Sequence, residues 1–308
     1  MNRILVYAPA EDQRGRAVWL AAALARRTGA ELTLVRVLEE SMVWSGQDEI
    51  GAAKLKQLLI ETETRELVRL ADSLRTSSNE RIRIDTEVHW GVPWEVVIAL
   101  VEQRGFDLVV KPARGLSHSG RVFFGATALH LFRRCPCPVW VVGDDGHPPQ
   151  RILLSIDPSL DAPRKSMASK LFGWGEWVRS ACQAELEVVS AWQAPGAELL
   201  KTELEPAEFD RYVRDAREQA ESGLQTMVDE AAPSTCVKRV NLLSGSARDV
   251  IPAFAEDQEF DLVVVGTLGR TGIAGELLGE TAETILRGVR CSVLAVAPRH
   301  RQPASHAD

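Results

Sequence analysis

A repeat of about half the chain constrains the fold more than any other feature of this sequence. Short segments of the first half reappear in the second half in the same order, most of them at one constant offset of 154 residues. A constant offset over several separate segments indicates a duplicated folding unit. The matches are Arg-Ile-Leu-Val at 3–6 with Arg-Ile-Leu-Leu at 151–154, Phe-Asp-Leu-Val-Val at 106–110 and 260–264, and Cys137 with Cys291.

The repeat also predicts the domain boundaries. The first matching pair has a smaller offset, 148 residues, so the second copy contains an insertion between Pro158 and Lys170. The chain has 308 residues, which accommodates two domains at roughly 150 residues each. Turn-forming residues and two successive prolines mark a linker where the first copy ends. We expect one domain over 1–143, a linker over 144–150, a second domain over 151–299 and a polar tail over 300–308.

Apolar runs alternate with amphipathic segments in both copies. Leu-Val-Val-Val at 262–265 is typical of a strand covered on both faces, and the apolar residues from Tyr212 to Met227 recur at helical spacing. This alternation predicts right-handed crossovers and a parallel sheet. We expect two tandem doubly wound, Rossmann-like α/β domains, each with a five-stranded, mainly parallel sheet and helices on both faces. The strands expected in the second copy are 152–156, 186–190, 237–243, 262–265 and 293–296.

Composition excludes several classes of function. A net charge of −7 disfavours nucleic-acid binding, although main-chain amides can bind a small anion without net positive charge. Five cysteines, an odd number, argue against a disulfide framework, and Cys135 and Cys137 lack partner ligands nearby in the sequence for a metal site. The first apolar run is too short for a signal peptide, and none reaches the ~18 residues of a membrane span. We expect a cytoplasmic protein.

The candidate site lies in the second copy. Ligands of doubly wound sheets bind beyond the carboxyl ends of the strands, where the strand order reverses, which here means after the first and fourth strands. An acid follows the first strand, and a loop with the spacing Gly-x2-Gly-x9-Gly follows the fourth. Such glycines let the main chain approach a polyphosphate, and helix N-termini favour negative charge. The candidate nucleotide-binding residues are Asp157, Gly266, Thr267, Gly269, Arg270, Gly279, Glu280 and Thr281.

The glycine spacing of the second copy resembles the signature of the universal stress protein family, and the resemblance to its tandem two-domain type covers both copies. The resemblance implies a stress-response protein that binds ATP or a related adenine nucleotide as a regulatory ligand. Mg²⁺ could bind together with the nucleotide. The family pattern places Ser or Thr directly after the last glycine, whereas Glu280 stands there and Thr281 follows. A carboxylate at this position would compete with phosphate for the amides of the helix and repel it.

The first copy departs further from the family pattern. Pro9 stands where the second copy has its acid, and Pro112 stands where it has the first loop glycine, which removes a main-chain donor. We therefore expect no nucleotide to bind there in the manner of the family. Lys111 and Arg114 could bind another anion.

Two other functions stay open. We expect no catalytic residues, because no catalytic triad or dyad can be assembled from the sequence, and a slow ATPase would have to use Asp157 and Glu280. Trp90 and Trp94 flank Gly91 after the third strand of the first copy. They could line a site for a lipid or other apolar ligand, in that domain or between the domains, although we favour the interpretation that they fill the vacant nucleotide pocket.

The resemblance also bears on assembly, because universal stress domains commonly pair through their last strand. Here 139–142 and 293–296 could pair within one chain, an internal pseudo-dimer that covers both sheet edges. A homodimer of the tandem chain is the alternative. We expect a small-molecule nucleotide as the partner, and the sequence identifies no protein partner.

Overall fold

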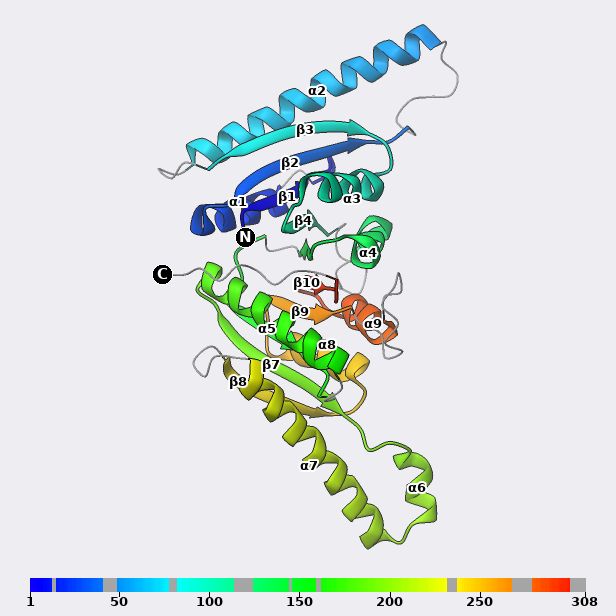
Figure 1. Cartoon of the computed structure of the whole chain (residues 1–308). Helices are drawn as coiled ribbons and strands as arrows, with labels where there is room; N and C mark the ends of the chain where they lie inside the picture. The colour runs from blue at the N-terminus through cyan, green and yellow to red at the C-terminus, as the bar shows by residue number, and fades with distance from the viewer. Residues whose placement is uncertain are drawn as a thin grey trace. The chain divides into compact units, whose positions relative to one another are not determined.

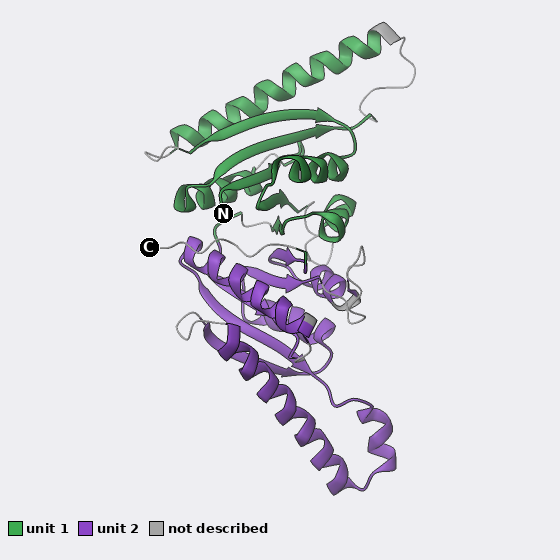
Figure 2. Cartoon of the chain, in the orientation of Figure 1, with its two compact units in different colours: residues 1–148, 299–308 green, residues 149–298 purple. Residues whose placement is uncertain are grey.

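The computed structural model describes residues 1–12, 15–40, 49–77, 82–113, 124–143, 146–158, 162–231, 237–267 and 279–299. The chain divides into two compact units (Figure 2). The first unit contains Met1–Pro148 together with the C-terminal residues from Arg299, and the second unit contains Pro149–Pro298.

The first unit is an α/β fold built on five parallel strands (Figure 1). Each neighbouring pair of strands runs in the same direction, with β1 and β4 side by side at the centre. In spatial order the strands are β3 (Ile84–Trp90), β2 (Glu31–Leu38), β1 (Arg3–Tyr7), β4 (Leu108–Pro112) and β5 (Val139–Val142). Its helices are α1 (Arg16–Thr28), α2 (Glu49–Thr76), α3 (Pro93–Arg104) and α4 (Gly125–Arg134).

The helices of the first unit cover both faces of its sheet. The connections from β1 to β3 run in one direction along the sheet and those from β3 to β5 run back, so right-handed crossovers place α1 and α2 on one face and α3 and α4 on the other. The guanidinium of Arg26 on α1 donates to the carbonyl oxygen of Leu74 on α2 at 2.8 Å. The central strand is buried on both faces, with Ile4, Leu5 and Val6 fully inaccessible to solvent.

The second unit repeats this topology, and it confirms the expected fold class. All four strand pairs within it are parallel. In spatial order the strands are β10 (Ser292–Val296), β9 (Leu262–Gly266), β6 (Arg151–Ser155), β7 (Glu185–Trp192) and β8 (Val237–Ser244). Its helices are α5 (Ala162–Cys182), α6 (Ala197–Glu203), α7 (Pro206–Ala231), α8 (Ala247–Asp257) and α9 (Glu280–Gly288).

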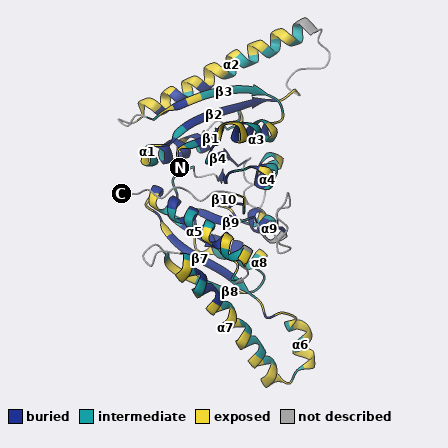
Figure 3. Ribbon diagram, viewed as in Figure 1, coloured by how far each residue is buried: buried dark blue, intermediate teal, exposed yellow. Residues whose placement is uncertain are grey.

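Two features of the second unit depart from simple expectations. Helix α5 has 21 residues where α1 has 13, so the extra residues of the second copy lengthen its first helix. The short helix α6 is absent from the sequence-based expectations and precedes α7, whose buried residues are confined to its C-terminal part, at Gly223, Leu224 and Met227. Helix α6 and the N-terminal part of α7 carry mostly exposed and half-buried residues (Figure 3).

The repeated sequence segments join the start of the first strand to the start of the fourth in each unit. The carboxylate of Asp107 accepts the main-chain N–H groups of Asn2 and Arg3, at 2.6 and 3.1 Å. In the second unit the carboxylate of Asp261 accepts those of Gln150 and Arg151, at 2.9 and 2.8 Å. A cation–π contact accompanies each pair, from Arg3 to Phe106 and from Arg151 to Phe260.

Among the residues that the structure describes, no helix combines the length and the apolar character needed to cross a bilayer.

Candidate functional site

The strand order of the second unit reverses between β6 and β9. The chain leaves β6 towards β7 on one side and leaves β9 towards β10 on the other, and ligands of doubly wound sheets bind beyond the carboxyl ends of the strands at such a reversal. Ser155 pairs with Val265 in this ladder. Asp157 and Thr267 each follow that pair by two residues, so the structure brings two of the expected site residues to the same edge of the sheet.

Asp157 lies at this edge of the sheet, two residues beyond the end of β6. Its carboxylate forms an ion pair with the Nε of Arg164 on α5, at 3.0 Å, and its side chain is 45% exposed. A partly exposed ion pair contributes little to stability, because water screens both charges. Its consequence is orientation, since the guanidinium holds the carboxylate at this edge of the sheet while leaving part of it exposed.

The two ends of the β9–α9 connection are held together by main-chain hydrogen bonds. The N–H of Thr267 donates to the carbonyl oxygen of Val296 at 2.8 Å, and the N–H of Gly279 donates to the carbonyl oxygen of Thr267 at 3.3 Å. Thr267 and Gly279 are both buried. Gly279 caps α9, and the N–H of Glu283 donates to its carbonyl oxygen at 2.9 Å. The N-terminus of α9 therefore begins directly beside the end of β9.

Part of the expected site lies outside the described residues. This applies to Gly269 and Arg270, and to the side chains of Glu280 and Thr281, whose main chain forms the start of α9. The described part of the site is therefore Asp157, the main chain from Gly266 to Thr267, and Gly279.

Gly266 has a packing role that the sequence does not reveal. A Cβ atom at this position would lie 3.2 Å from the Cε of Met167 and 3.4 Å from the Cδ1 of Leu171, both on α5. These contacts are tight, so a side chain here would force α5 residues to move. A glycine therefore fits the end of β9 without displacing α5, whatever ligand binds there.

Comparison with known proteins gives the family. The model of the universal stress protein family matches residues 1–143 and again 149–297. The chain belongs to the universal stress protein family. The resemblance inferred from the glycine loop and the tandem repeat is confirmed, and the protein is a tandem member of this family of stress-response proteins.

Relatives share the tandem arrangement of this universal stress protein. The chain aligns over 310 residues with Universal stress protein E of Escherichia coli K12, at 27% identity. The aligned region covers 98% of this chain and 95% of the relative. A functionally unknown protein from Pseudomonas aeruginosa PAO1 has a similar structure, with a TM-score of 0.69, 22% identity and coverage of 97% and 93%. A universal stress protein from Archaeoglobus fulgidus DSM 4304 has a TM-score of 0.63 at 14% identity, with coverage of 95% and 96%.

The corresponding edge of the first unit of this universal stress protein has different chemistry. Lys111, at the end of β4, is buried, and its Nζ donates to the carbonyl oxygen of Pro112 at 2.5 Å. Pro9 follows β1 at the position of Asp157. Arg114, the second cation expected here, lies outside the described residues.

Asp12 is a buried acid of the first unit that the sequence does not single out. Only 5% of its side chain is exposed, and its carboxylate lies 3.7 Å from the Nε of Arg16. Burial raises the pKa of Asp12, although Arg16 and the main-chain amides of Gly15 and Ala17 act in the opposite direction. No sequence pattern marks such a residue, because its burial depends on how the chain enters α1.

Trp90 and Trp94 pack against different elements of the first unit. The Nζ of Lys56 on α2 lies 5.1 Å from the centre of the Trp90 ring. The Trp94 ring stacks on His130 of α4, with a centroid distance of 4.5 Å and an interplanar angle of 12°. The two rings therefore act at separate contacts, one with α2 and one between α3 and α4.

Proposed function

We propose that the second unit binds an adenine nucleotide such as ATP, as a regulatory ligand, at the carboxyl edge of β6 and β9. The observation that carries this proposal is the placement of Asp157 and the Gly279 end of α9 at the one point where the strand order reverses. Membership of the universal stress protein family supports the same ligand class.

The described groups have the chemistry that a nucleotide requires. A carboxylate such as that of Asp157 accepts hydrogen bonds from the hydroxyl groups of a ribose. The N–H groups of α9 that precede Glu283 have no carbonyl partner within the helix, and together with the helix dipole they favour a phosphate. Arg164 holds that carboxylate at the edge of the sheet through their ion pair.

A regulatory role fits this arrangement better than hydrolysis. Arg164 engages the carboxylate of Asp157 and so orients it as a hydrogen-bond acceptor for a bound ligand. The buried main-chain contact between Thr267 and Gly279 couples the loop ends to the start of α9. A ligand that contacts this loop would therefore act on the position of α9, which is how nucleotide occupancy would be communicated to a partner.

The test is to identify what the purified full-length protein carries and how it binds ATP. We expect an adenine nucleotide to be released on denaturation, and Asp157→Asn to weaken ATP binding about tenfold, the loss expected for a charged hydrogen-bond acceptor. Asp210→Asn, at an exposed position of α7, is the matched control and should bind ATP as the parent does. Absence of nucleotide together with no binding at millimolar ATP would overturn the proposal.

Phosphate release measured in the same samples distinguishes regulation from slow hydrolysis. Stoichiometric binding without release is expected. Sustained release that Asp157→Asn abolishes would instead make the second unit a slow ATPase.

A further inference from the structure

The two units carry different side chains at the carboxyl ends of their outer strands. The last residues of β2 and β3 pair Leu38 with Trp90, and the last residues of β7 and β8 pair Trp192 with Ser244. The glycine that follows each of these strand-end pairs has a positive φ in both units. The turn is therefore alike in the two units, and the side chains beside it differ.

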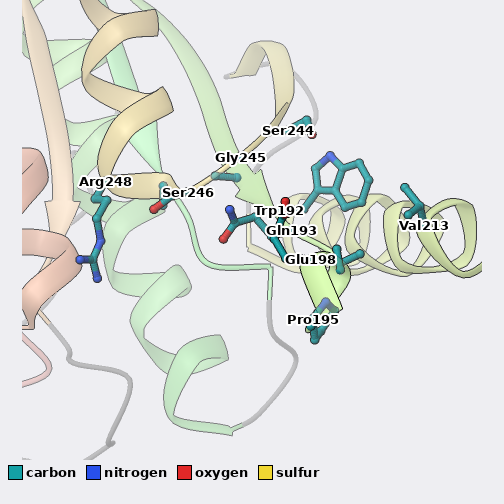
Figure 4. Close-up of a pocket in the computed structure, with 14 residues that line it drawn as sticks. Trp192, Gln193, Pro195, Glu198, Val213, Ser244, Gly245, Ser246 and Arg248 are labelled. Atoms are coloured by element: carbon teal, nitrogen blue, oxygen red, sulfur yellow. The ribbon is translucent and has the colours of Figure 1, made fainter. Parts of the chain in front are cut away.

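A pocket with a volume of about 750 Å³ lies at this strand end in the second unit (Figure 4). Trp192 lines it together with residues of α6, of α7 and of the start of α8. Its two charged lining residues, Glu198 and Arg248, are both exposed. Water screens such charges, so they do not specify a ligand for this pocket.

A second difference between the units is buried, in the connection from the last helix to the last strand. Cys135 ends α4 in the first unit, and Cys137 follows before β5. The repeat places Val289 and Cys291 at these positions of the second unit. The N–H of Val289 closes α9 with a hydrogen bond of 3.2 Å, as that of Cys135 closes α4 with one of 2.9 Å. The fold therefore accepts an apolar side chain here, and the thiol of Cys135 is an addition specific to the first unit.

The two thiols of the first unit are in contact and shielded from solvent. Their Sγ atoms lie 3.7 Å apart, with Pro136 as the one residue between the cysteines. Cys135 is fully buried and Cys137 is 5% exposed, and both are free cysteines. A disulfide has an S–S distance of about 2.05 Å, so the sulfur atoms would have to approach by roughly 1.7 Å to form one.

A cation accompanies this thiol pair. The Nε of Arg299, which packs with the first unit, donates to the carbonyl oxygen of Cys135 at 2.8 Å. Burial lowers the pKa of Arg299, whereas negative charge on the sulfur atoms of Cys135 and Cys137 acts in the opposite direction. The guanidinium therefore lies close enough to both sulfur atoms to stabilise a thiolate, which is the form of cysteine that reacts with oxidants.

We propose that Cys135 and Cys137 form a redox site that a peroxide converts reversibly to a disulfide. The thiolate of one cysteine attacks a peroxide oxygen, the O–O bond breaks, and the sulfur becomes a sulfenic acid. With hydrogen peroxide, the hydroxide released takes up the proton that this thiol had lost and becomes water. The second thiol then attacks the sulfenic sulfur, the S–S bond forms, and its proton leaves with the sulfenic hydroxyl as a second water molecule. The two thiols have lost two electrons and two protons to one molecule of hydrogen peroxide.

Burial sets the rate of this reaction, and the size of the ring sets its reversibility. Burial, followed by the contact with Cys135, raises the pKa of the Cys137 thiol, so oxidation waits for local opening and is slower than that of an exposed thiol. A disulfide across one residue closes a small ring, and strained disulfides are readily reduced. The pair should therefore respond to sustained oxidation and return to the dithiol when reducing thiols are restored. It lies in the first unit and acts independently of the proposed nucleotide.

Peptide mapping of the full-length protein tests the proposal. Trypsin cleaves after Arg134 and Arg151, so one peptide, 135–151, contains both cysteines and no third. The protein is incubated with hydrogen peroxide, denatured, alkylated with iodoacetamide and digested. We expect this peptide to appear without alkyl groups and lighter than the dithiol peptide by two hydrogen atoms. Dithiothreitol added before denaturation should restore both alkylation sites.

Two kinds of variant serve as controls. Cys135→Val gives the first unit the residue of the second, so it should unfold at the temperature of the parent, and its 135–151 peptide should never lose two hydrogen atoms. Arg299→Gln should slow disulfide formation about three- to tenfold, because less thiolate forms, whereas Arg299→Lys keeps the charge and should oxidise at a rate closer to that of the parent.

The partly exposed Cys291 is the internal standard for the dose of oxidant. Two alkylation sites on the 135–151 peptide under conditions that oxidise Cys291 would overturn the proposal. A disulfide that joins Cys135 or Cys137 to another cysteine, or a product that dithiothreitol does not reverse, would overturn it as well. Oxidation of Arg299→Gln at the rate of the parent would overturn the part assigned to the guanidinium.

Discussion

The carboxylate of Asp261 accepts the main-chain N–H of Arg151 at 2.8 Å and so joins the first residue of β6 to the residue that precedes β9. Asp107 and Arg3 form the same link in the first unit. These links explain why Arg-Ile-Leu and Phe-Asp-Leu persist in both halves of the chain. They align β6 and β9, whose opposite ends lead to Asp157 and Thr267.

Removing this link should destabilise the second unit. We expect Asp261→Ala to lower the free energy of unfolding by about 1–3 kcal/mol, because two main-chain donors lose a charged acceptor. Urea unfolding measures the change. Asp210→Ala, at an exposed position of α7, should change the free energy by less than about 0.5 kcal/mol, and equal effects of the two substitutions would contradict the structural role of Asp261.

Gly266→Val should destabilise the protein whether or not nucleotide is present. The new side chain would press on Met167 and Leu171, and overpacking of this kind costs about 1–3 kcal/mol. Thermal unfolding of nucleotide-free protein is the measurement. If the substitution combined with Met167→Ala recovers part of the loss, the contact with Met167 is its cause. No loss in the single variant would show that α5 can shift away, and the packing explanation would be wrong.

Glu87 should contribute to stability in a pH-dependent manner. Burial alone would raise the pKa of its carboxyl, but hydrogen bonds from Arg104 and His89 outweigh burial and lower the pKa below its ordinary 4.5. The unfolded chain therefore binds more protons as the pH falls, so the contribution is present at neutral pH and is lost as the pH falls from about 5 towards 3.

Unfolding at several pH values tests this expectation. Glu87→Gln should be less stable than the parent at about pH 7, and the difference should shrink as the pH falls below 4.5, because the parent then loses the contribution. Glu102→Gln, at an exposed position of α3, is the control and should follow the parent throughout. A constant difference between Glu87→Gln and the parent would exclude titration of this carboxyl as the cause.

The four described cysteines should differ in reactivity. Cys135, Cys137 and Cys182 are buried, whereas Cys291 is partly exposed. Burial, followed by the contact with Cys135 at 3.7 Å, raises the pKa of the Cys137 thiol well above its ordinary range and so suppresses its thiolate. In peptide mapping after brief alkylation of the native protein, Cys291 should be modified before the other three. Early modification of Cys137 would contradict its burial.

The fold could be predicted because it depends on features that the sequence displays. The continuous apolar run at 262–265 and the helical periodicity from Tyr212 to Met227 each extend over enough residues to specify an element, and the repeat doubles every such signal. Helix α6 could not be predicted in this way, because its seven residues contain none that is buried and so show no apolar face.

The candidate site could be predicted only in its position along the chain. Asp157 and Gly279 follow strands and precede a helix in the sequence, which is enough to place them at the carboxyl edge. The ion pair with Arg164 and the contact of Gly266 with Met167 depend on how α5 rotates over the sheet. The pairing of Trp192 with Ser244 depends on the register between two strands more than 40 residues apart in the chain, which no local pattern specifies.

The two units carry the indole of their strand-end pair on different strands, Trp90 on β3 and Trp192 on β7. Leu38→Trp combined with Trp90→Ser would give the first unit the strand-end pair of the second. Duplication thus left this protein with two copies of one glycine turn, at Gly91 and at Gly245, with different side chains beside each. Each unit can therefore serve as the internal reference for the other when substitutions at this strand end are compared.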